Sequence, residues 1–171
     1  KNLFRKELIK PLIIVFAIEL IQHVTGINVV VFYSTDILID ANVPAADYVT
    51  AALGFVSVIV TVVSFFLIDR VGRKPLLLLS ETIVLLCLIG LSISFIFKNE
   101  NSEIFMNVLS IVSLVIFMGG FSIGIGPIPT LLVAEILPDD VRSYGISFGE
   151  SVNWIAQFII GVTFYPLQQL L

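Results

Sequence analysis

Long apolar runs without any charge restrict the fold of this chain more than any other feature. Residues 48–68 and 104–134 form runs of 21 and 31 residues without a charged side chain, and residues 75–97 contain a single acid, Glu81. A helix that crosses a bilayer needs about 20 mostly apolar residues. Of the whole sequence 58% is hydrophobic and 13% charged, whereas a soluble domain is roughly 25% charged. Lipid is therefore the expected solvent.

We predict an all-α polytopic membrane protein with five transmembrane helices, at about residues 11–39, 46–68, 75–97, 104–135 and 148–171. A signal peptide does not explain the first run, because its apolar core would be only about 7–15 residues long. Membrane β-strands do not explain the runs either, because such strands are about 9–11 residues long and alternate polar with apolar side chains. The composition also excludes a disordered protein, a nucleic-acid binder and a conventional soluble enzyme.

The basic residues predict the orientation of these helices. Eight of the nine lie in the first, third and fifth segments outside the predicted helices, and only Lys98 lies elsewhere. Because short basic loops stay on the cytosolic side, we expect the start of the chain to be cytosolic. The eight are Lys1, Arg5, Lys6, Lys10, Arg70, Arg73, Lys74 and Arg142. Since the chain begins with Lys1 and its last predicted helix stops at the chain end, we expect a fragment of a longer protein.

Two of the predicted helices should be interrupted. The first contains Thr25 and Gly26, and the fourth contains four glycines and two prolines between Gly119 and Pro129. Proline removes a helix donor and clashes with the preceding turn. The freed backbone groups must then face protein or water. In secondary transporters, paired interruptions of this kind mark a binding site near the middle of the membrane. The alternative is that Gly and Pro are simply common in membrane helices.

Polar side chains in the first helix share one face. Positions 19, 22, 23 and 26 have the i, i+3, i+4, i+7 spacing of a helix face, and they hold Glu19, Gln22, His23 and Gly26. Polar groups inside a membrane face the bundle interior. Amides both donate and accept hydrogen bonds, which suits a neutral polyhydroxyl solute. The alternative for Glu19 and His23 is hydrogen bonding that only packs helices together.

The last predicted helix repeats this pattern. Asn153 and Gln157 lie on one face at i, i+4, and Trp154 is an indole that could stack on a sugar ring. The alternative for Trp154 is a place in the aromatic belt at the membrane interface.

Four motifs resemble those of the sugar porters in the major facilitator superfamily. Residues 22–28 (QHVTGIN), followed by Phe32, Tyr33 and Ser34, resemble the family's QQxSGIN…YYS signature. Residues 69–74 (DRVGRK) resemble its [DE]RxGR[RK] loop, and residues 126–129 (GPIP) with Glu135 and Arg142 resemble its GPIPW…E…R stretch. Residues 153–154 match its NW pair. The pattern is most similar to the insect facilitated trehalose and glucose transporters.

The resemblance implies that residues 1–171 are a partial C-terminal half, comprising helices seven to eleven of twelve, and that a six-helix N-terminal half is a missing partner. It implies sugar-binding roles for Gln22, His23, Asn28, Asn153 and Trp154. It places Phe32 and Tyr33 in an outer gate. It implies a cytosolic charge network of Asp69, Arg70, Arg73, Glu135 and Arg142.

The sequence departs from the family pattern at several of these positions. His23 replaces the second glutamine and Thr130 replaces a tryptophan. Ser57, Ser122 and Gln157 stand where the family has an asparagine, an acid and a second asparagine. These three residues and Thr130 are further candidates for sugar contact.

The resemblance therefore implies transport of a hexose or trehalose by alternating access, as a facilitative uniporter in the plasma membrane. Proton-coupled symport is the alternative, because Glu19 and His23 can titrate. A channel or sensor is a third interpretation, but a channel favours a ring of pore charges, and the sequence has none. The single His and single Cys lie far apart, so we expect no enzyme, metal or cofactor.

Overall fold

The computed structural model describes residues 5–40, 45–97 and 103–170, and in this part of the chain the structure is helical without strands. Lys1, Lys98 and Leu171, on which some of the predictions above rest, lie outside the described residues. The helices are η1 (Lys6–Leu8), α1 (Ile9–Val24), α2 (Ile27–Asp40), α3 (Ala46–Val71), α4 (Arg73–Ile96), α5 (Glu103–Ile123), α6 (Pro127–Ile136) and α7 (Arg142–Leu170).

Four stretches of these helices are long and apolar enough to cross a membrane by length and composition: Ile9–Asp36, Ala46–Val71, Arg73–Ser94 and Ile104–Ile136. They confirm the prediction of an all-α polytopic membrane protein. The fifth predicted crossing corresponds to α7, which has 29 residues but is not among these four stretches. Its crossing of the membrane therefore stays a prediction.

The helices form two compact units. Unit 1 combines the described residues up to Val29 with those from Ile128 onward, and so contains α1, most of α6, and α7. Unit 2 is the continuous stretch Val30–Pro127, which contains α3, α4, α5 and most of α2.

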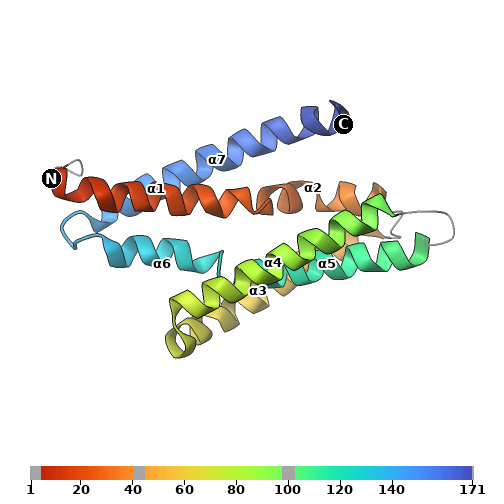
Figure 1. Cartoon of the computed structure of the whole chain (residues 1–171), viewed down its shortest axis with the longest axis horizontal. Coiled ribbons are helices and arrows are strands. Elements are labelled where there is room, and N and C mark those ends of the chain that lie inside the picture. Colours follow the sequence, from red (N-terminus) through yellow and green to blue (C-terminus); the bar gives the residue numbers. More distant parts are fainter. Residues whose placement is uncertain (1–4, 41–44, 98–102, 171) are drawn as a thin grey trace. The chain divides into compact units, whose positions relative to one another are not determined.

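Unit 1 is held together by close packing of α1 against α7, which run beside one another in Figure 1. Gly145 and Gly149 are four residues apart on α7, where Gly145 lies against Leu137 and Gly149 against α1, and small residues let membrane helices approach closely. A Cβ atom at Gly149 would lie 3.3 Å from Val15 and 3.4 Å from the Glu19 carboxylate. Val15 is fully buried in a small core with two residues from and just after α6, Val133 and Leu137. Gly149 therefore sets how near α7 comes to the polar face of α1.

In unit 2, α5 packs along both α3 and α4, and Figure 1 shows α4 and α5 side by side. Leu114 and Phe117 on α5 and Leu76 and Val84 on α4 are almost fully buried. Most other large apolar side chains of α3 and α4 are exposed within this chain, as expected for helices that face lipid or other protein segments.

The predicted interruption of the first helix is confirmed between α1 and α2. Gly26 has φ +82°, a conformation that glycine adopts without the steric cost that a Cβ atom brings. It follows the last residue of α1 by two positions, and its N–H donates to the His23 carbonyl at 3.1 Å. This is the position at which helices commonly end in a left-handed residue.

The second predicted interruption is also confirmed, but it is shorter than expected. Gly119 and Gly120 remain inside α5, and only residues 124–126 lie between α5 and α6. Pro127 opens α6 rather than breaking a helix, because the first helical position has no intrahelical N–H bond to lose.

Two serines bind the backbone groups that this interruption frees. The Ser80 hydroxyl donates to the Gly120 carbonyl at 2.6 Å and accepts from the Ile125 N–H at 3.0 Å. Ser64 donates to the Ile123 carbonyl at 2.5 Å. Side-chain hydroxyls are one of the means by which membrane helices re-satisfy a broken backbone ladder.

The expected loop at residues 69–74 is a single residue. Asp69 and Arg70 lie in the last turn of α3, and α4 begins at Arg73, so Gly72 alone joins the two helices. Its φ of +91° lies where glycine is favoured. Gly72 therefore makes the whole turn within the expected loop.

Candidate functional site

The buried face of α1 carries two ionisable side chains. Leu12, Val15, Glu19 and His23 are its buried residues, and Glu19 and His23 are only 2% and 5% exposed. They lie one helical turn apart, as the sequence pattern predicted. Because a buried charge is costly unless it is paired or hydrogen-bonded, the partners of these two groups determine what the site can do.

Glu19 and Gln22 share one partner on α7. The Asn153 Nδ2 donates to Glu19 Oε2 at 2.9 Å and to Gln22 Oε1 at 3.3 Å. A side-chain amide has two N–H groups, so Asn153 can serve both of these acceptors at once. The structure thus brings the predicted residues Gln22 and Asn153 together.

His23 is held from the other side of the α1–α2 break. The Asn28 Nδ2 donates to His23 Nδ1 at 2.6 Å, and Asn28 is itself 3% exposed. With Nδ1 accepting, the neutral ring carries its hydrogen on Nε2. This Nε2 is buried without a hydrogen-bond partner among the described residues. The turn at Gly26 therefore places Asn28 against His23 and leaves one imidazole N–H unused.

We call these five side chains, Glu19, Gln22, His23, Asn28 and Asn153, the α1–α7 cluster. It combines amide donors and acceptors, an imidazole and one carboxyl group on apolar helices of unit 1. Few precisely oriented polar groups among apolar ones are typical of small-molecule sites, and this set can donate to and accept from hydroxyl groups. Among the described residues no group of three or more His, Cys, Asp or Glu side chains could hold a metal ion.

Three other predicted residues of unit 1 lie outside this cluster's hydrogen bonds. Trp154 is 66% exposed within the chain, although it follows Asn153 directly. Gln157 lies one turn further along α7 and is half-buried, and Thr130 on α6 is exposed. Their roles in binding stay predictions.

The predicted residues of unit 2 form one pair. Ser57 on α3 and Ser122 on α5 are joined by a hydrogen bond of 2.8 Å between their hydroxyl oxygens. The structure therefore brings together two positions at which the sequence departs from the family pattern. Phe32 and Tyr33 lie on α2, where Phe32 is exposed and Tyr33 half-buried. Their gating role stays a prediction.

The residues of the predicted charge network lie in both units. Asp69, Arg70 and Arg73 are exposed at the α3–α4 junction of unit 2. Glu135 and Arg142 belong to unit 1, where the Arg142 Nη2 lies 2.6 Å from the Asp139 carboxylate. The network therefore stays a prediction, and its Arg142 has a partner that we did not predict.

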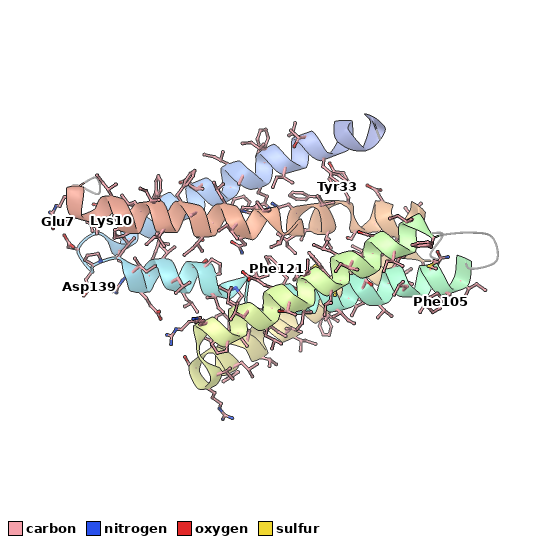
Figure 2. All side chains as sticks on the ribbon, viewed as in Figure 1. Glu7, Lys10, Tyr33, Phe105, Phe121 and Asp139 are labelled. Carbon is pink, nitrogen blue, oxygen red and sulfur yellow. The ribbon has the colours of Figure 1, made fainter. Side chains whose placement is uncertain are left out.

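Charged side chains gather at one end of unit 1. Figure 2 shows Glu7, Lys10 and Asp139 there, and the ends of Arg5 and Asp140 lie 3.7 Å apart in the same region. These groups are exposed, so an ion pair such as that of Arg5 with Asp140 contributes only about 0–1 kcal/mol to stability. They mark an end of the unit that lies in water rather than in lipid.

The sequence did not predict the partners that two residues have in these contacts. Glu19 was placed on the polar face of α1, but its bond to Asn153 joins residues 134 positions apart, and no sequence spacing reveals such a pair. Asp139 could have been found, because it lies three residues before Arg142 and acid–base pairs at i, i+3 commonly interact.

Comparison with known proteins matches the whole chain. The family model described as "Sugar (and other) transporter" matches residues 1–171. The chain is 37% identical over 165 residues to a facilitated trehalose transporter of Culex quinquefasciatus, covering 95% of this chain and 32% of that protein. It is 36% identical over 164 residues to the mouse solute carrier family 2 facilitated glucose transporter member 3, covering 95% and 33%. The chain thus spans about a third of the length of these two relatives.

Proposed function

This chain belongs to the sugar transporter family, and we propose that it forms part of a membrane protein that carries a hexose or trehalose across the bilayer. The α1–α7 cluster is the observation that carries this proposal. His23 and Asn28 are buried and Gln22 and Asn153 half-buried on helices of a membrane protein, and they offer both donors and acceptors to a neutral sugar. The names of the relatives, a facilitated trehalose transporter and a facilitated glucose transporter, support the same substrate class. The family groups transporters, so we propose no enzymatic role.

The transport mode that we propose is facilitative uniport by alternating access. Two interrupted helices provide positions at which such a protein can bend, since hinges are a few residues that absorb backbone rotation. The partner that we propose is the N-terminal six-helix half that the motif resemblance implies, and it is compatible with a chain that spans about a third of the relatives' length.

Uptake of labelled glucose and trehalose by the complete protein that carries this sequence tests the site. Gln22→Ala and Asn28→Ala should each raise the apparent Km or abolish uptake, because each removes a donor and an acceptor from the α1–α7 cluster. Asn107→Ala is the matched control, since Asn107 is an amide on α5 of unit 2. Unchanged uptake in both cluster variants would contradict the assignment of the site.

Uptake with and without a pH gradient separates uniport from proton-coupled symport. Uniport predicts that sugar does not accumulate against its own gradient when a proton gradient is imposed. Accumulation driven by the proton gradient would replace the uniport proposal with the symport alternative.

We also propose a plasma-membrane protein in which Lys10 and Arg142 lie on the cytosolic side. Single cysteines introduced at these positions should react with a membrane-impermeant maleimide only after the cells are permeabilised. A cysteine at Tyr48, near the start of α3, should react in intact cells. The reverse pattern would overturn the orientation.

A further inference from the structure

We propose that the outward face of α4 is a docking surface for a membrane-spanning helix of a partner protein, which carries a lysine or arginine side chain near its middle. The outward face consists of five residues that share one side of the helix and are all exposed within this chain: Leu78, Glu81, Thr82, Leu85 and Ile89. It lies in unit 2 and shares no residue with the α1–α7 cluster, so the inference does not depend on the proposed function.

The acid of this face lies deep in an apolar helix. The stretch Arg73–Ser94 is long and apolar enough to cross a membrane, and the middle of its 22 residues falls between Ile83 and Val84. At the rise of an α-helix, Glu81 is about 4 Å from this midpoint along the helix axis. Acids at such a depth are costly, and they normally face the interior of a helix bundle or pair with another group.

Within this chain Glu81 faces outward and is unpaired. None of the other described residues forms a hydrogen bond or an ion pair with its carboxyl group. On a helix the neighbours able to reach it are three or four positions away, and all of these are apolar: Leu77, Leu78, Val84 and Leu85. Lys74 lies two turns earlier on the same side of α4, but it forms no ion pair with Glu81.

The opposite face of α4 is already occupied by its own unit. This buried face includes Leu76, Ser80, Val84 and Cys87. It belongs to a helix that packs along α5, and Ser80 also donates to the Gly120 carbonyl of α5. The packing of α4 inside unit 2 therefore turns Glu81 away from the described part of this unit and leaves its carboxyl group to a group from outside the chain.

The chemistry of the outward face specifies a basic partner. Carboxylate oxygens accept hydrogen bonds from Lys and Arg, and such charge-assisted bonds are the strong ones. Thr82 does not compete for this donor, because its hydroxyl donates to the Leu78 carbonyl at 2.8 Å. Leu78 and Leu85 are more than half exposed, and they can cover the apolar stem of a long basic side chain.

A second copy of this chain does not supply the basic group. The stretches 11–69, 75–97, 99–141 and 143–171 contain neither Lys nor Arg, so the basic residues of a second copy lie at the ends of its helices. A symmetric pair uses the same patch on both copies, and docking through this face would then bring one Glu81 towards the other.

The amine of a lipid headgroup does not fit the depth of the site. Arg73 begins α4 and marks the nearer end of the apolar stretch. Glu81 lies about 12 Å further along the helix axis, whereas headgroups lie in the interfacial region outside the hydrocarbon core. A basic side chain on a second membrane helix reaches this level directly.

Synthetic membrane-spanning peptides test the proposal on the complete protein that carries this sequence. Each peptide has about 20 leucine and alanine residues and an acceptor dye. One has a lysine at its centre, the second a glutamine at its centre, and the third a lysine close to one end. A donor dye is attached to a cysteine introduced at Ile96, which is exposed at the end of α4, and energy transfer in lipid vesicles measures binding. The central-lysine peptide should bind about tenfold more tightly than the other two, as expected for a hydrogen bond between charged groups.

Three variants locate this preference. Glu81→Gln should abolish it, because the amide has no charge. Glu81→Lys should reverse it, so that a peptide with a central glutamate binds more tightly than the central-lysine peptide. Asp47→Asn is the matched control and should keep the wild-type preference, since Asp47 is an exposed acid of the same unit in the first turn of α3.

Four outcomes would overturn the proposal. Equal binding of the central-lysine and central-glutamine peptides would leave the outward face to lipid, and an unchanged preference in Glu81→Gln would place the contact elsewhere. Equally tight binding of the end-lysine peptide would assign the contact to the membrane surface. Energy transfer between labelled copies of the protein that the central-lysine peptide does not reduce would assign the face to a second copy.

Discussion

The serine that stabilises the α5–α6 interruption gives the sharpest test of how this fold tolerates a broken helix. Ser80 is fully buried, and its hydroxyl satisfies the Gly120 carbonyl and the Ile125 N–H at once. Alanine keeps the Cβ atom, which is the part of Ser80 nearest to Gly124. Ser80→Ala therefore removes two hydrogen bonds and almost no packing.

The expected cost follows from these two bonds. In membrane proteins a side-chain hydrogen bond contributes about 0.6 kcal/mol on average and about 1.7 kcal/mol at most. Two bonds to buried backbone groups should then cost about 1–3 kcal/mol. We expect the free energy of unfolding to fall by this amount, because the freed groups remain buried in the variant.

Ser92→Ala is the matched control on the same helix. Ser92 is exposed and donates only to the Leu88 carbonyl one turn earlier, which keeps its own helical partner. Its removal should change stability by less than about 0.5 kcal/mol, as is usual for surface substitutions. Equilibrium unfolding of both variants in lipid bicelles measures the difference. Equal stabilities for Ser80→Ala and Ser92→Ala would refute the reasoning that these hydroxyl bonds sustain the interruption.

Three further predictions follow from the glycines and the serine pair. A Cβ atom at Gly26 or at Gly54 would meet no neighbouring atom within 4 Å. Gly26→Ala should nevertheless destabilise the protein by about 1–2 kcal/mol, because Gly26 has a φ of +82°. Gly54→Ala lies inside α3 and should be neutral or stabilising by up to about 1 kcal/mol, and thermal unfolding compares the two variants. Gly149→Leu should separate α7 from α1 and abolish disulfide crosslinking between cysteines placed on these helices, while Gly54→Leu should not. A double-mutant cycle of Ser57→Ala and Ser122→Ala should give a coupling energy of about 0.6–1.7 kcal/mol, and additive effects would contradict the 2.8 Å bond between them.

Local sequence signals predicted much of the fold. Both interruptions were expected from glycine and proline, because the backbone consequences of these residues act within a few positions. The polar face of α1 was expected from helical spacing alone. The predicted extent of the second interruption was too long, since Gly119 and Gly120 pack inside α5 and Pro127 starts a helix.

Pairings between helices could not be predicted from spacing. The bond between Asn153 and Glu19 depends on the register of α7 against α1, which Gly149 sets by its close approach. The choice of Ser80 as a partner for the Ile125 N–H likewise depends on how α4 packs against α5. Such contacts arise from tertiary packing, so residue type and period reveal only that a polar group needs a partner.

The two parts of unit 1 are far apart in the sequence, so they are synthesised at different times. Its two parts are separated by the whole of unit 2, so Glu19 leaves the ribosome 134 residues before Asn153. At about 5–20 residues per second, α1 waits roughly 7–27 s for that partner. A charged residue at the centre of a membrane helix costs about 2.5–3.5 kcal/mol on insertion scales.

We therefore expect α1 to remain beside the insertion machinery until α7 has been made, instead of entering lipid when its own synthesis ends. Photocrosslinking from α1 in stalled nascent chains should detect the translocon until Asn153 has emerged, and Glu19→Leu should release α1 early. For this family member, the polar group that suits a buried site is also the group that delays membrane integration.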